Sequence, residues 1–412
     1  MDIRTPKYTD LLIIGGGIFG VSTAYYYKRD NPYKDVIVIE RKELCSGNTS
    51  FAAGLMSRVR SCAHVIPLSI ETYRVIPELE KITGDRLPVY YNGAIHLAVK
   101  AETVSALEKT LKVASDLGID SENITASKAK QLAPWLNASQ AKRIAFIPDE
   151  AITDPYLLGM AFANAAKKIG VKFKRNTEVI ELLKNDRHVT GAETSDGIYL
   201  ADITVLAAGV WSINLAFKIG ISLPMAPVRS QYWITEMSES LFPDSSPTVL
   251  IPEANFYARP QGKALLFGIR EANSMYINPV DLPEEIHGFP FSQNNGWDDL
   301  IENYPKIVGF FPMLGITGIK NYIAGFSGYT PDSQLIAGEV PGMNGLLLAT
   351  GCVGAGISVS GGIGLGIARL AAGRTNPFDF SHYKPDRFGL FDPFSKEHLT
   401  LCAEARSKKT SG

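Results

Sequence analysis

The chain has 412 residues with a formal net charge of −1, and 45% of its residues are apolar while 20% are charged. This composition is ordinary for a globular protein, and the length exceeds that of one ordinary core, so two domains are expected. The near-neutral charge and the absence of a long basic run argue against nucleic acid or an anionic membrane as a partner.

The N-terminal residues and the cysteine spacing indicate in which cellular compartment the protein is expected. No apolar stretch approaches the ~18 residues that a membrane span needs, and the first ten residues, MDIRTPKYTD, resemble neither a signal peptide nor a transit peptide. We therefore expect a cytoplasmic protein without a transmembrane segment. The four cysteines (Cys45, Cys62, Cys352 and Cys402) have no CxxC spacing, which favours free thiols, and the six histidines form no HExxH pair, so no metal site is expected.

The first 40 residues predict a βαβ unit. Residues 11–15, LLIIG, are a short apolar run typical of a buried parallel strand. A helix-like segment follows the glycines at 18–29, and the apolar run at 35–40 predicts the second strand. Residues 65–83 have helical spacing with a proline interruption.

The remaining elements follow from alternation, amphipathic spacing and turn residues. They are antiparallel strands in 87–99, a helix in 101–118, a helix in 156–170 followed by strands, long antiparallel strands in 227–236 and 255–271 with a hairpin turn at 261–263, a helix-like stretch in 297–314, and a strand, glycine turn and helix in 345–373. The last polar residues, 404–412, are expected to be frayed.

A glycine motif follows the first predicted strand and opens the first helix. Gly15, Gly17 and Gly20 have GxGxxG spacing, and Glu40 closes the second strand. Glycine permits the tight turn and the close approach of the backbone to a pyrophosphate, the helix N-terminus attracts the phosphates, and the acid accepts hydrogen bonds from a ribose. Strand, glycines, helix and acid together predict dinucleotide binding.

A second glycine-rich turn distinguishes FAD from NAD. Residues 349–362, ATGCVGAGISVSGG, form a turn into a helix far from the first motif. A reduced flavin carries negative charge near N1 and O2, which a helix N-terminus pointing there would stabilise. The pattern therefore favours FAD, and the alternative is a plain tight turn.

The predicted fold is α/β, with a discontinuous Rossmann-like FAD-binding domain and an α+β substrate domain on a mostly antiparallel sheet. Residues 1–84, 150–225 and 320–390 are assigned to the FAD-binding domain. Residues 85–149 and 226–319 are assigned to the substrate domain, and 391–412 to a C-terminal tail.

Four segments carry a resemblance to a known family. DLLIIGGGIFG, ITVLAAGVWS, GYTPDSQLIAGEVPGMNGLLLATG and PDRF stand in the order of the D-amino-acid oxidase superfamily of FAD-dependent oxidoreductases. Within it the chain is most similar to the flavin domain of dimethylglycine and sarcosine dehydrogenases, through SGNTSFAAGLMS, IETYRVIPELEKITG, PMAPVRSQYWITE and NFYARPQGKALLFGIRE. It is also similar to sarcosine and glycine oxidases. The dehydrogenases usually carry a further folate-binding portion, so a folate-coupled reaction is not expected of a chain of 412 residues.

The resemblance implies FAD as cofactor and a set of residues around it. The candidates are Gly15, Gly17, Ile18, Phe19, Gly20, Glu40, Arg41, Ser46, Asn48, Thr49, Phe51, Ala53, Gly54, Leu55, Val179, Ala208, Gly209, Trp211, Gly325, Gly351, Gly354, Ala355, Gly356 and Ile357.

Two positions imply that FAD is bound without a covalent bond. In the dehydrogenases a histidine in the loop of residues 46–54 bonds to the flavin 8α carbon, and here that position is Phe51. Other sarcosine oxidases use a cysteine that aligns with Gly325. Neither residue offers a nucleophile. The ring of Phe51 is expected either to pack on the dimethylbenzene edge of the flavin or to join the core.

The resemblance also implies a substrate and a reaction. Family members oxidise the C–N bond of amino acids or N-methyl amines by hydride transfer to flavin N5, which gives an imine. A substrate carboxylate calls for an arginine fork. Candidate substrate residues are Tyr257, Arg270, Arg259 and Ser230, with Arg259 also open to a purely structural role and with Arg58 and Arg60 near the flavin loop.

Three departures from the relatives leave the exact substrate open. Ser230 replaces a histidine of the dehydrogenases, and Ser327 replaces an arginine of glycine oxidase. The lysine with which sarcosine oxidases activate oxygen falls near Leu266, which favours an electron carrier over O2 as the acceptor. The alternatives are an FAD-dependent 2-hydroxy acid dehydrogenase on the same fold and a non-catalytic regulatory flavoprotein. The oligomeric state is left open.

Overall fold

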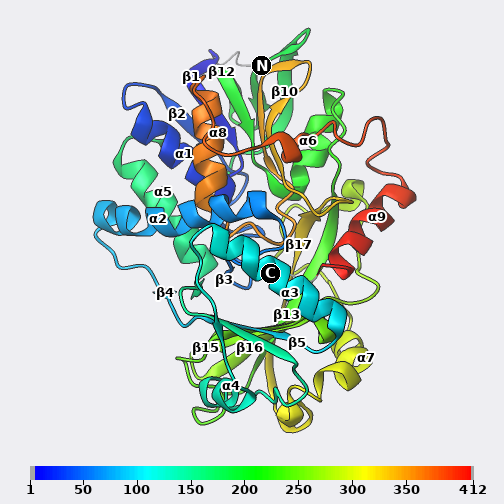
Figure 1. The fold of residues 1–412 in the computed structure, drawn as a ribbon. Helices are drawn as coiled ribbons and strands as arrows, with labels where there is room; N and C mark the ends of the chain where they lie inside the picture. Colours follow the sequence, from blue (N-terminus) through cyan, green and yellow to red (C-terminus); the bar gives the residue numbers. More distant parts are fainter. Residues whose placement is uncertain (1–4, 410–412) are drawn as a thin grey trace.

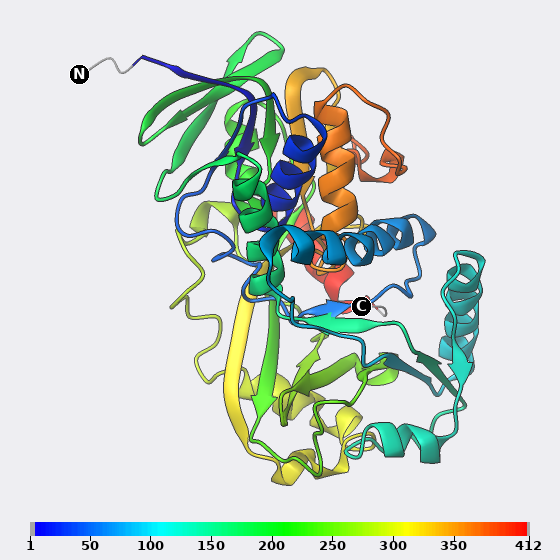
Figure 2. The same cartoon turned by 90° about the vertical axis from the view of Figure 1, so that its left-hand side faces the viewer.

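The computed structural model describes residues 5–409 and contains two large sheets with helices around them (Figures 1 and 2). Within these residues the α-helices are α1 (Ile18–Asp30), α2 (Ile66–Thr83), α3 (Ala101–Asp116), α4 (Ala126–Leu132), α5 (Pro155–Lys168), α6 (Ser212–Lys218), α7 (Trp297–Ile307), α8 (Ser360–Ala371) and α9 (Lys396–Ser407). Short 3₁₀ helices are η1 (Ala63–Val65), η2 (Gly209–Trp211), η3 (Pro252–Ala254), η4 (Pro279–Asp281), η5 (Pro312–Ile316) and η6 (Ser381–Tyr383).

The first sheet has eight strands in the order β10-β11-β19-β12-β1-β2-β9, with β18 paired to β19. Its central strands run parallel, and the strand β2, VIVI, is buried throughout, as a two-sided parallel strand must be. The bounds are β1 (Lys7–Ile14), β2 (Val36–Ile39), β9 (Lys172–Lys174), β10 (Val179–Asn185), β11 (His188–Thr194), β12 (Gly197–Leu206), β18 (Ile336–Val340) and β19 (Met343–Thr350).

Helices α1, α2, α5 and α8 pack together on one face of this sheet (Figure 2). The glycines of α8 permit the close approach. A side chain at Gly362 would place its Cβ 2.3 Å from the Cα of Leu68 in α2. Small residues at this crossing therefore bring α8 against α1 and α2.

The second sheet also has eight strands, in the order β17-β13-β16-β15-β14-β5-β7-β6. Its core is aromatic, with the rings of Trp233, Phe256 and Phe267 stacked at centroid distances of 5.7 Å. The bounds are β5 (Ala94–Ala98), β6 (Glu122–Asn123), β7 (Arg143–Ile147), β13 (Ala226–Thr235), β14 (Thr248–Ile251), β15 (Phe256–Gln261), β16 (Ala264–Ile269) and β17 (Ile319–Tyr329). A small third sheet joins β3 (Leu55–Met56), β8 (Ala151–Thr153) and β4 (Val89–Tyr90).

The predicted fold class is confirmed, and the hairpin between β15 and β16 turns at Gly262, whose φ is 59°. The division into 1–84, 150–225 and 320–390 against 85–149 and 226–319 stays a prediction. The strand β17, which starts at Ile319, pairs with β13 in the second sheet. Among the described residues, no helix has the length and apolarity needed to cross a membrane.

The second glycine turn leads into a helix, as expected, and this helix begins at Ser360. Two local expectations were wrong. The helix α2 continues through Pro77 without interruption, because burial of its apolar face, which includes Val75, Ile76 and Leu79, outweighs the hydrogen bond that the proline removes. Residues 404–407, expected to be frayed, complete α9, and Arg406 is only 3% exposed. Residues 410–412 lie outside the described residues.

Candidate functional site

A cavity of about 1070 Å³ lies where the carboxyl ends of the parallel strands of the first sheet face the second sheet. Ligand sites in open α/β sheets occur at this edge. The strand-end residues on its wall are Ile14, Ile39, Ala207 and Ala349. The volume is at the upper end of the ~300–1,000 Å³ typical of ligand pockets, so the cavity suits a large cofactor together with a small substrate.

The first glycine turn brings backbone to the cavity wall. Gly15 has a φ of 105°, and a Cβ there would lie 2.5 Å from the carbonyl oxygen of Ala207. Gly17 caps α1 without a side-chain hydrogen bond, and the first turn of α1 contains no acidic residue. The N-terminus of α1 therefore presents its dipole to the cavity. Gly20 is not on the wall, and its close contact with the Gly15 carbonyl shows a packing role.

Glu40 lies on the wall at the end of β2, and its carboxylate is held by the backbone. The Gly16 amide donates to Oε2 at 2.8 Å, and the Lys42 amide donates to Oε1 at 2.9 Å. Each carboxylate oxygen can accept more than one hydrogen bond. The fixed carboxylate can thus also accept from the hydroxyls of a ribose.

The loop of residues 46–54 forms another part of the wall. Phe51 and Gly325 are in contact, since a Cβ at Gly325 would lie 3.0 Å from the Cβ of Phe51. Phe51 also packs against a cluster that includes Phe326, so its ring serves both the wall and the core. The Oδ1 atom of Asn48 is buried without a hydrogen-bond partner among the described residues. A buried acceptor on a cavity wall calls for a donor from a ligand.

Every residue predicted to contact the cofactor lines this cavity except Gly20. The turn of residues 351–357 borders it directly, although α8 starts three residues later, so the turn itself and not the first turn of the helix forms the wall. Six residues of the segment 280–287 also line it, and the segment carries no motif that would have indicated this. They are tied to the wall by Trp211, whose Nε1 donates to the Pro283 carbonyl at 2.8 Å.

Three of the predicted substrate residues meet at the far end of the cavity. Tyr257, Arg270 and Ser230 all line it. Gly268 on the neighbouring strand leaves space for the Tyr257 ring, because a Cβ there would lie 2.3 Å from that ring. The Arg270 guanidinium carbon is 5.9 Å from the centre of the same ring. Ser230 donates to the Ser327 hydroxyl at 3.3 Å.

Arg259 and Arg58 are not on the cavity wall. Arg259 donates to the carbonyls of Ala53 and Pro260, and so ties β15 to the loop of residues 46–54. Arg58 lies over the Tyr73 ring and donates to the Asp149 carbonyl at 3.0 Å. Both geometries indicate structural roles.

Arg60 does line the cavity and is only 5% exposed. Its Nη2 donates to the Ser358 hydroxyl at 2.6 Å. The segment before it is fixed by Glu150, which accepts from the amides of Arg58 at 2.7 Å and Val59 at 2.8 Å. Burial, with Arg270 adding to it, lowers the pKa of Arg60 to about 10, so the side chain stays charged at neutral pH.

The C-terminal helix α9 also reaches the cavity, which sequence reasoning missed. It packs against β13 and β17 (Figure 1). Arg406 and Lys409 line the wall, and the Lys409 Nζ donates to the Val353 carbonyl at 2.7 Å. Neither residue belongs to a recognisable motif.

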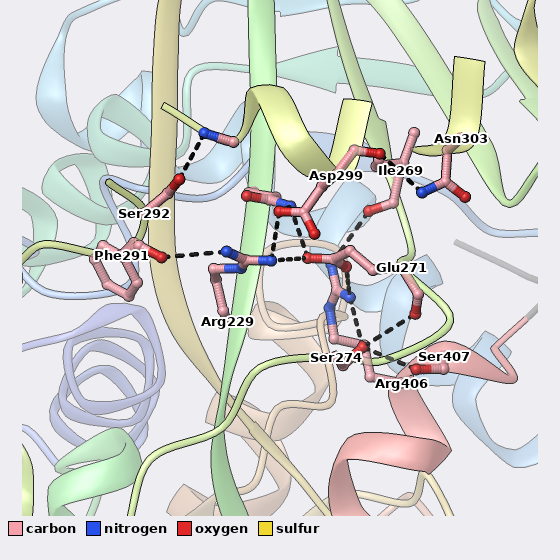
Figure 3. Close-up of polar contacts among 12 residues, drawn as sticks. Arg229, Ile269, Glu271, Ser274, Phe291, Ser292, Asp299, Asn303, Arg406 and Ser407 are labelled. Carbon is pink, nitrogen blue, oxygen red and sulfur yellow. Dashed lines mark hydrogen bonds and ion pairs between the residues drawn. The ribbon is translucent and has the colours of Figure 1, made fainter. Parts of the chain in front are cut away.

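A buried charge network holds this helix in place (Figure 3). Glu271, directly after Arg270, forms ion pairs with Arg406 and with Arg229, the latter at 2.8 Å. Arg229 also pairs with Asp299 of α7 at 2.7 Å. Although burial opposes the charged form, the Glu271 carboxylate raises the pKa of Arg406. Arg406 is therefore positively charged, and Glu271 is its counter-ion. The network joins α7, β13 and α9 beside Arg270.

The tyrosines at this end are hydrogen-bond donors and not bases. Burial raises the pKa of Tyr232 to about 12, and it raises the pKa of Tyr257 and of Tyr329 as well. All three phenols are therefore neutral near pH 7. They can orient a substrate but cannot remove its proton.

The sequence comparisons agree with this geometry. Residues 10–370 match the family model described as FAD dependent oxidoreductase. The chain belongs to this family of FAD-dependent oxidoreductases. FAD is accordingly its cofactor. Three features of the cavity wall fit FAD: the glycine turn at the N-terminus of α1, the fixed carboxylate of Glu40, and the Asn48 oxygen that has no hydrogen-bond partner among the described residues.

Individual relatives refine the comparison. The chain is 28% identical over 370 residues to the mitochondrial sarcosine dehydrogenase of Homo sapiens, which covers 88% of this chain and 39% of that protein. It is 28% identical over 417 residues to the mitochondrial dimethylglycine dehydrogenase of Rattus norvegicus, covering 99% of this chain and 48% of that protein. The chain thus spans less than half the length of these relatives. The crystal structure of L-proline dehydrogenase from P. horikoshii superposes with a TM-score of 0.81 at 23% identity, covering 93% of this chain and 98% of that one.

Proposed function

We propose that this flavoenzyme oxidises the C–N bond of an amino acid or an N-methyl amine that carries a carboxylate. The observation that carries the proposal is the placement of Arg270 and Arg60, both buried, with Tyr257 at the end of a cavity whose other walls suit FAD. An arginine fork binds a carboxylate in a fixed orientation. The relatives named sarcosine and dimethylglycine dehydrogenase support this substrate class.

When bound, FAD would supply the hydride acceptor that allows the C–N bond to be oxidised to an imine or iminium, and water would then hydrolyse this product. For this step the amine must be neutral. The positive charges of Arg60 and Arg270 on the cavity wall disfavour the charged form of a bound substrate ammonium. The cavity therefore favours the reactive amine without a basic side chain, and the proton leaves to solvent.

The direct test is an anaerobic screen in which flavin bleaching reports reduction by each compound. N-methyl and free amino acids are compared with 2-hydroxy acids of the same carbon skeleton. Bleaching by amines supports the proposal, and bleaching only by hydroxy acids would replace it with the hydroxy-acid reaction. If no compound reduces a flavin that light can still reduce, a non-catalytic role is favoured. Repeating the assay with O2 and with a dye acceptor tests the further proposal that Leu266 favours a carrier.

We expect FAD to be released intact when the protein is denatured. Neither Phe51 nor Gly325 has an atom that can bond to the flavin 8α carbon, and the two positions lie against each other. After acid precipitation and centrifugation, the yellow colour should be in the supernatant. Colour in the pellet, together with a matching increase in the mass of the chain, would contradict the expectation.

Replacing Glu40 with alanine should weaken FAD retention. The substitution removes the carboxylate that fixes the Gly16 amide at 2.8 Å and that is placed to bind the ribose. The measurement is the flavin-to-protein absorbance ratio after extensive dialysis, with circular dichroism to show an intact fold. Glu284→Ala, an exposed acid on the same wall, is the matched control. Full retention in Glu40→Ala would show that this carboxylate is not an anchor.

A further inference from the structure

The segment of residues 279–287, called the strap below, lies between β16 and α7 and contains neither a strand nor an α-helix. Six of its residues line the cavity. The chain on each side of the strap is fixed to β13. Before the strap, the Arg229 amide donates to the Met275 carbonyl at 2.8 Å. After it, the Arg229 guanidinium donates to the Phe291 carbonyl at 3.1 Å. The strap is therefore a short bridge with two anchored ends.

Two side chains that follow β12 hold the strap by its carbonyls. The Asn214 Nδ2 atom in α6 donates to the Pro279 carbonyl at 2.8 Å, and the Trp211 Nε1 atom in η2 donates to the Pro283 carbonyl at 2.8 Å. Both distances are those of ordinary N–H···O hydrogen bonds. The strap is thus attached to the part of the molecule that contains the first sheet.

Arg41 holds the strap beside the position expected for a ribose. It directly follows Glu40, whose carboxylate is placed to bind the ribose, and it donates to the Glu284 carbonyl. The Arg41 guanidinium carbon also lies 5.0 Å from the centre of the Trp211 ring. Two of the side chains that bind the strap therefore contact each other on the ribose side of the cavity.

The apolar side chains of the strap continue toward the loop of residues 46–54. Ile286 is only 2% exposed and belongs to a cluster with Phe326, and Leu282 and Phe51 pack against the same cluster. Ile286 and Leu282 also line the cavity. The strap thus extends along the wall from the neighbourhood of Glu40 to that of Phe51.

We propose that the strap is a further part of the FAD site, which closes over the cofactor between its ribose and its flavin ring and opens before FAD leaves. The proposal concerns retention of the cofactor and is independent of the compound that the enzyme oxidises. Neither Phe51 nor Gly325 can bond to the flavin, so retention depends on noncovalent contacts. An opening strap loses its side-chain hydrogen bonds and exposes Ile286, and this loss slows the release of FAD.

The test is the rate at which the holoenzyme exchanges its FAD for excess FAD labelled with heavy isotopes. Samples are desalted at intervals, and mass spectrometry of the extracted flavin gives the fraction exchanged. Trp211→Phe keeps an aromatic ring and removes the donor to Pro283. Exchange should become about 2- to 10-fold faster, as expected for one lost neutral hydrogen bond. Asn214→Ala removes the donor to Pro279 and should have an effect of similar size.

Hydrogen exchange of the holoenzyme distinguishes a strap from a direct contact between Trp211 and FAD. In Trp211→Phe, the backbone amides within residues 279–287 should exchange faster, whereas those of β15 (Phe256–Gln261) should not change. If FAD leaves faster while the amides of the strap exchange at the normal rate, Trp211 holds FAD itself and the proposal is wrong. An unchanged rate of FAD exchange in both Trp211→Phe and Asn214→Ala overturns it as well.

The matched control is Trp297→Phe, the same substitution at a tryptophan that is 45% exposed and does not line the cavity. It should leave the rate of FAD exchange unchanged. Circular dichroism and flavin absorbance show whether each variant is folded and loaded, and if Trp211→Phe does not fold, Asn214→Ala decides the test with the same two measurements. Neither measurement needs turnover, so a failure of the proposed amine oxidation would leave the result on the strap unaffected.

Discussion

Replacing Arg270 with alanine should lower kcat/KM for the true substrate by about 2–4 kcal/mol, or about 30- to 700-fold. Arg270 is 9% exposed and lines the cavity, and its guanidinium carbon lies 5.9 Å from the centre of the Tyr257 ring. A substrate carboxylate that loses this partner is left desolvated at the same place. Since the same contact is made before and during hydride transfer, most of the loss should appear in KM.

Two variants make the Arg270 result specific. Arg270→Lys keeps the charge but lacks the fork, so it should recover part of the lost activity. Arg143→Ala, on β7 away from the cavity and paired with Glu108, should leave kcat/KM unchanged. Flavin content is measured in each variant to separate substrate binding from cofactor loss. If the Arg270→Ala enzyme keeps its full flavin content and its kcat/KM is unchanged, Arg270 does not bind the substrate.

The parts of the site that depend on the local backbone conformation could be predicted from the sequence. The turn at Gly15 requires a φ of 105° and a close approach to Ala207, conditions that only glycine meets easily, so the motif has a short and recognisable spacing. The position of Glu40 could be predicted as well, because Glu40 closes the second strand of one βαβ unit of ordinary length. The contact between Phe51 and Gly325 followed only from resemblance, because the two residues lie on segments far apart in the sequence.

The parts set by long-range pairing could not be predicted. The polar end of the chain has the composition of a frayed tail, yet Arg406 bonds to Glu271, 135 residues away, and this pairing brings Lys409 to the cavity. A single sequence contains no signal for such a pair. Similarly, Tyr257 and Arg259 are two residues apart on β15, which predicts that they face the same side of the strand. Only Tyr257 reaches the cavity, because Arg259 donates to the carbonyls of Ala53 and Pro260 instead.

Replacing Glu271 with alanine should lower the free energy of unfolding by about 3–5 kcal/mol, the range for breaking a buried ion pair from one side. Glu271 is 2% exposed and accepts from Arg229, Gln231 and Arg406 (Figure 3). Arg229 keeps Asp299 as a partner at 2.7 Å. Among the described residues, Arg406 then keeps only the neutral oxygens of Ser274 and Ile269 as acceptors, so its buried charge loses its counter-ion.

The loss of local stability in Glu271→Ala should be largest in the C-terminal helix α9. Hydrogen exchange of α9 (Lys396–Ser407) should accelerate more than that of α1, because Arg406 anchors this helix beside Arg270. Urea unfolding gives the free-energy change. Glu239→Ala is the control, since Glu239 pairs with Lys263 at an exposed position and should change the urea midpoint little.

A double variant distinguishes a stranded charge from a loss of packing. Arg406→Met removes the charge that Glu271→Ala leaves behind, so the double variant should be more stable than Glu271→Ala alone. If the two losses simply add, the carboxylate acts through packing and not as the counter-ion of Arg406. If α9 exchanges at the normal rate in Glu271→Ala, the helix is held by its apolar contacts alone, and the network does not position Lys409 at the cavity.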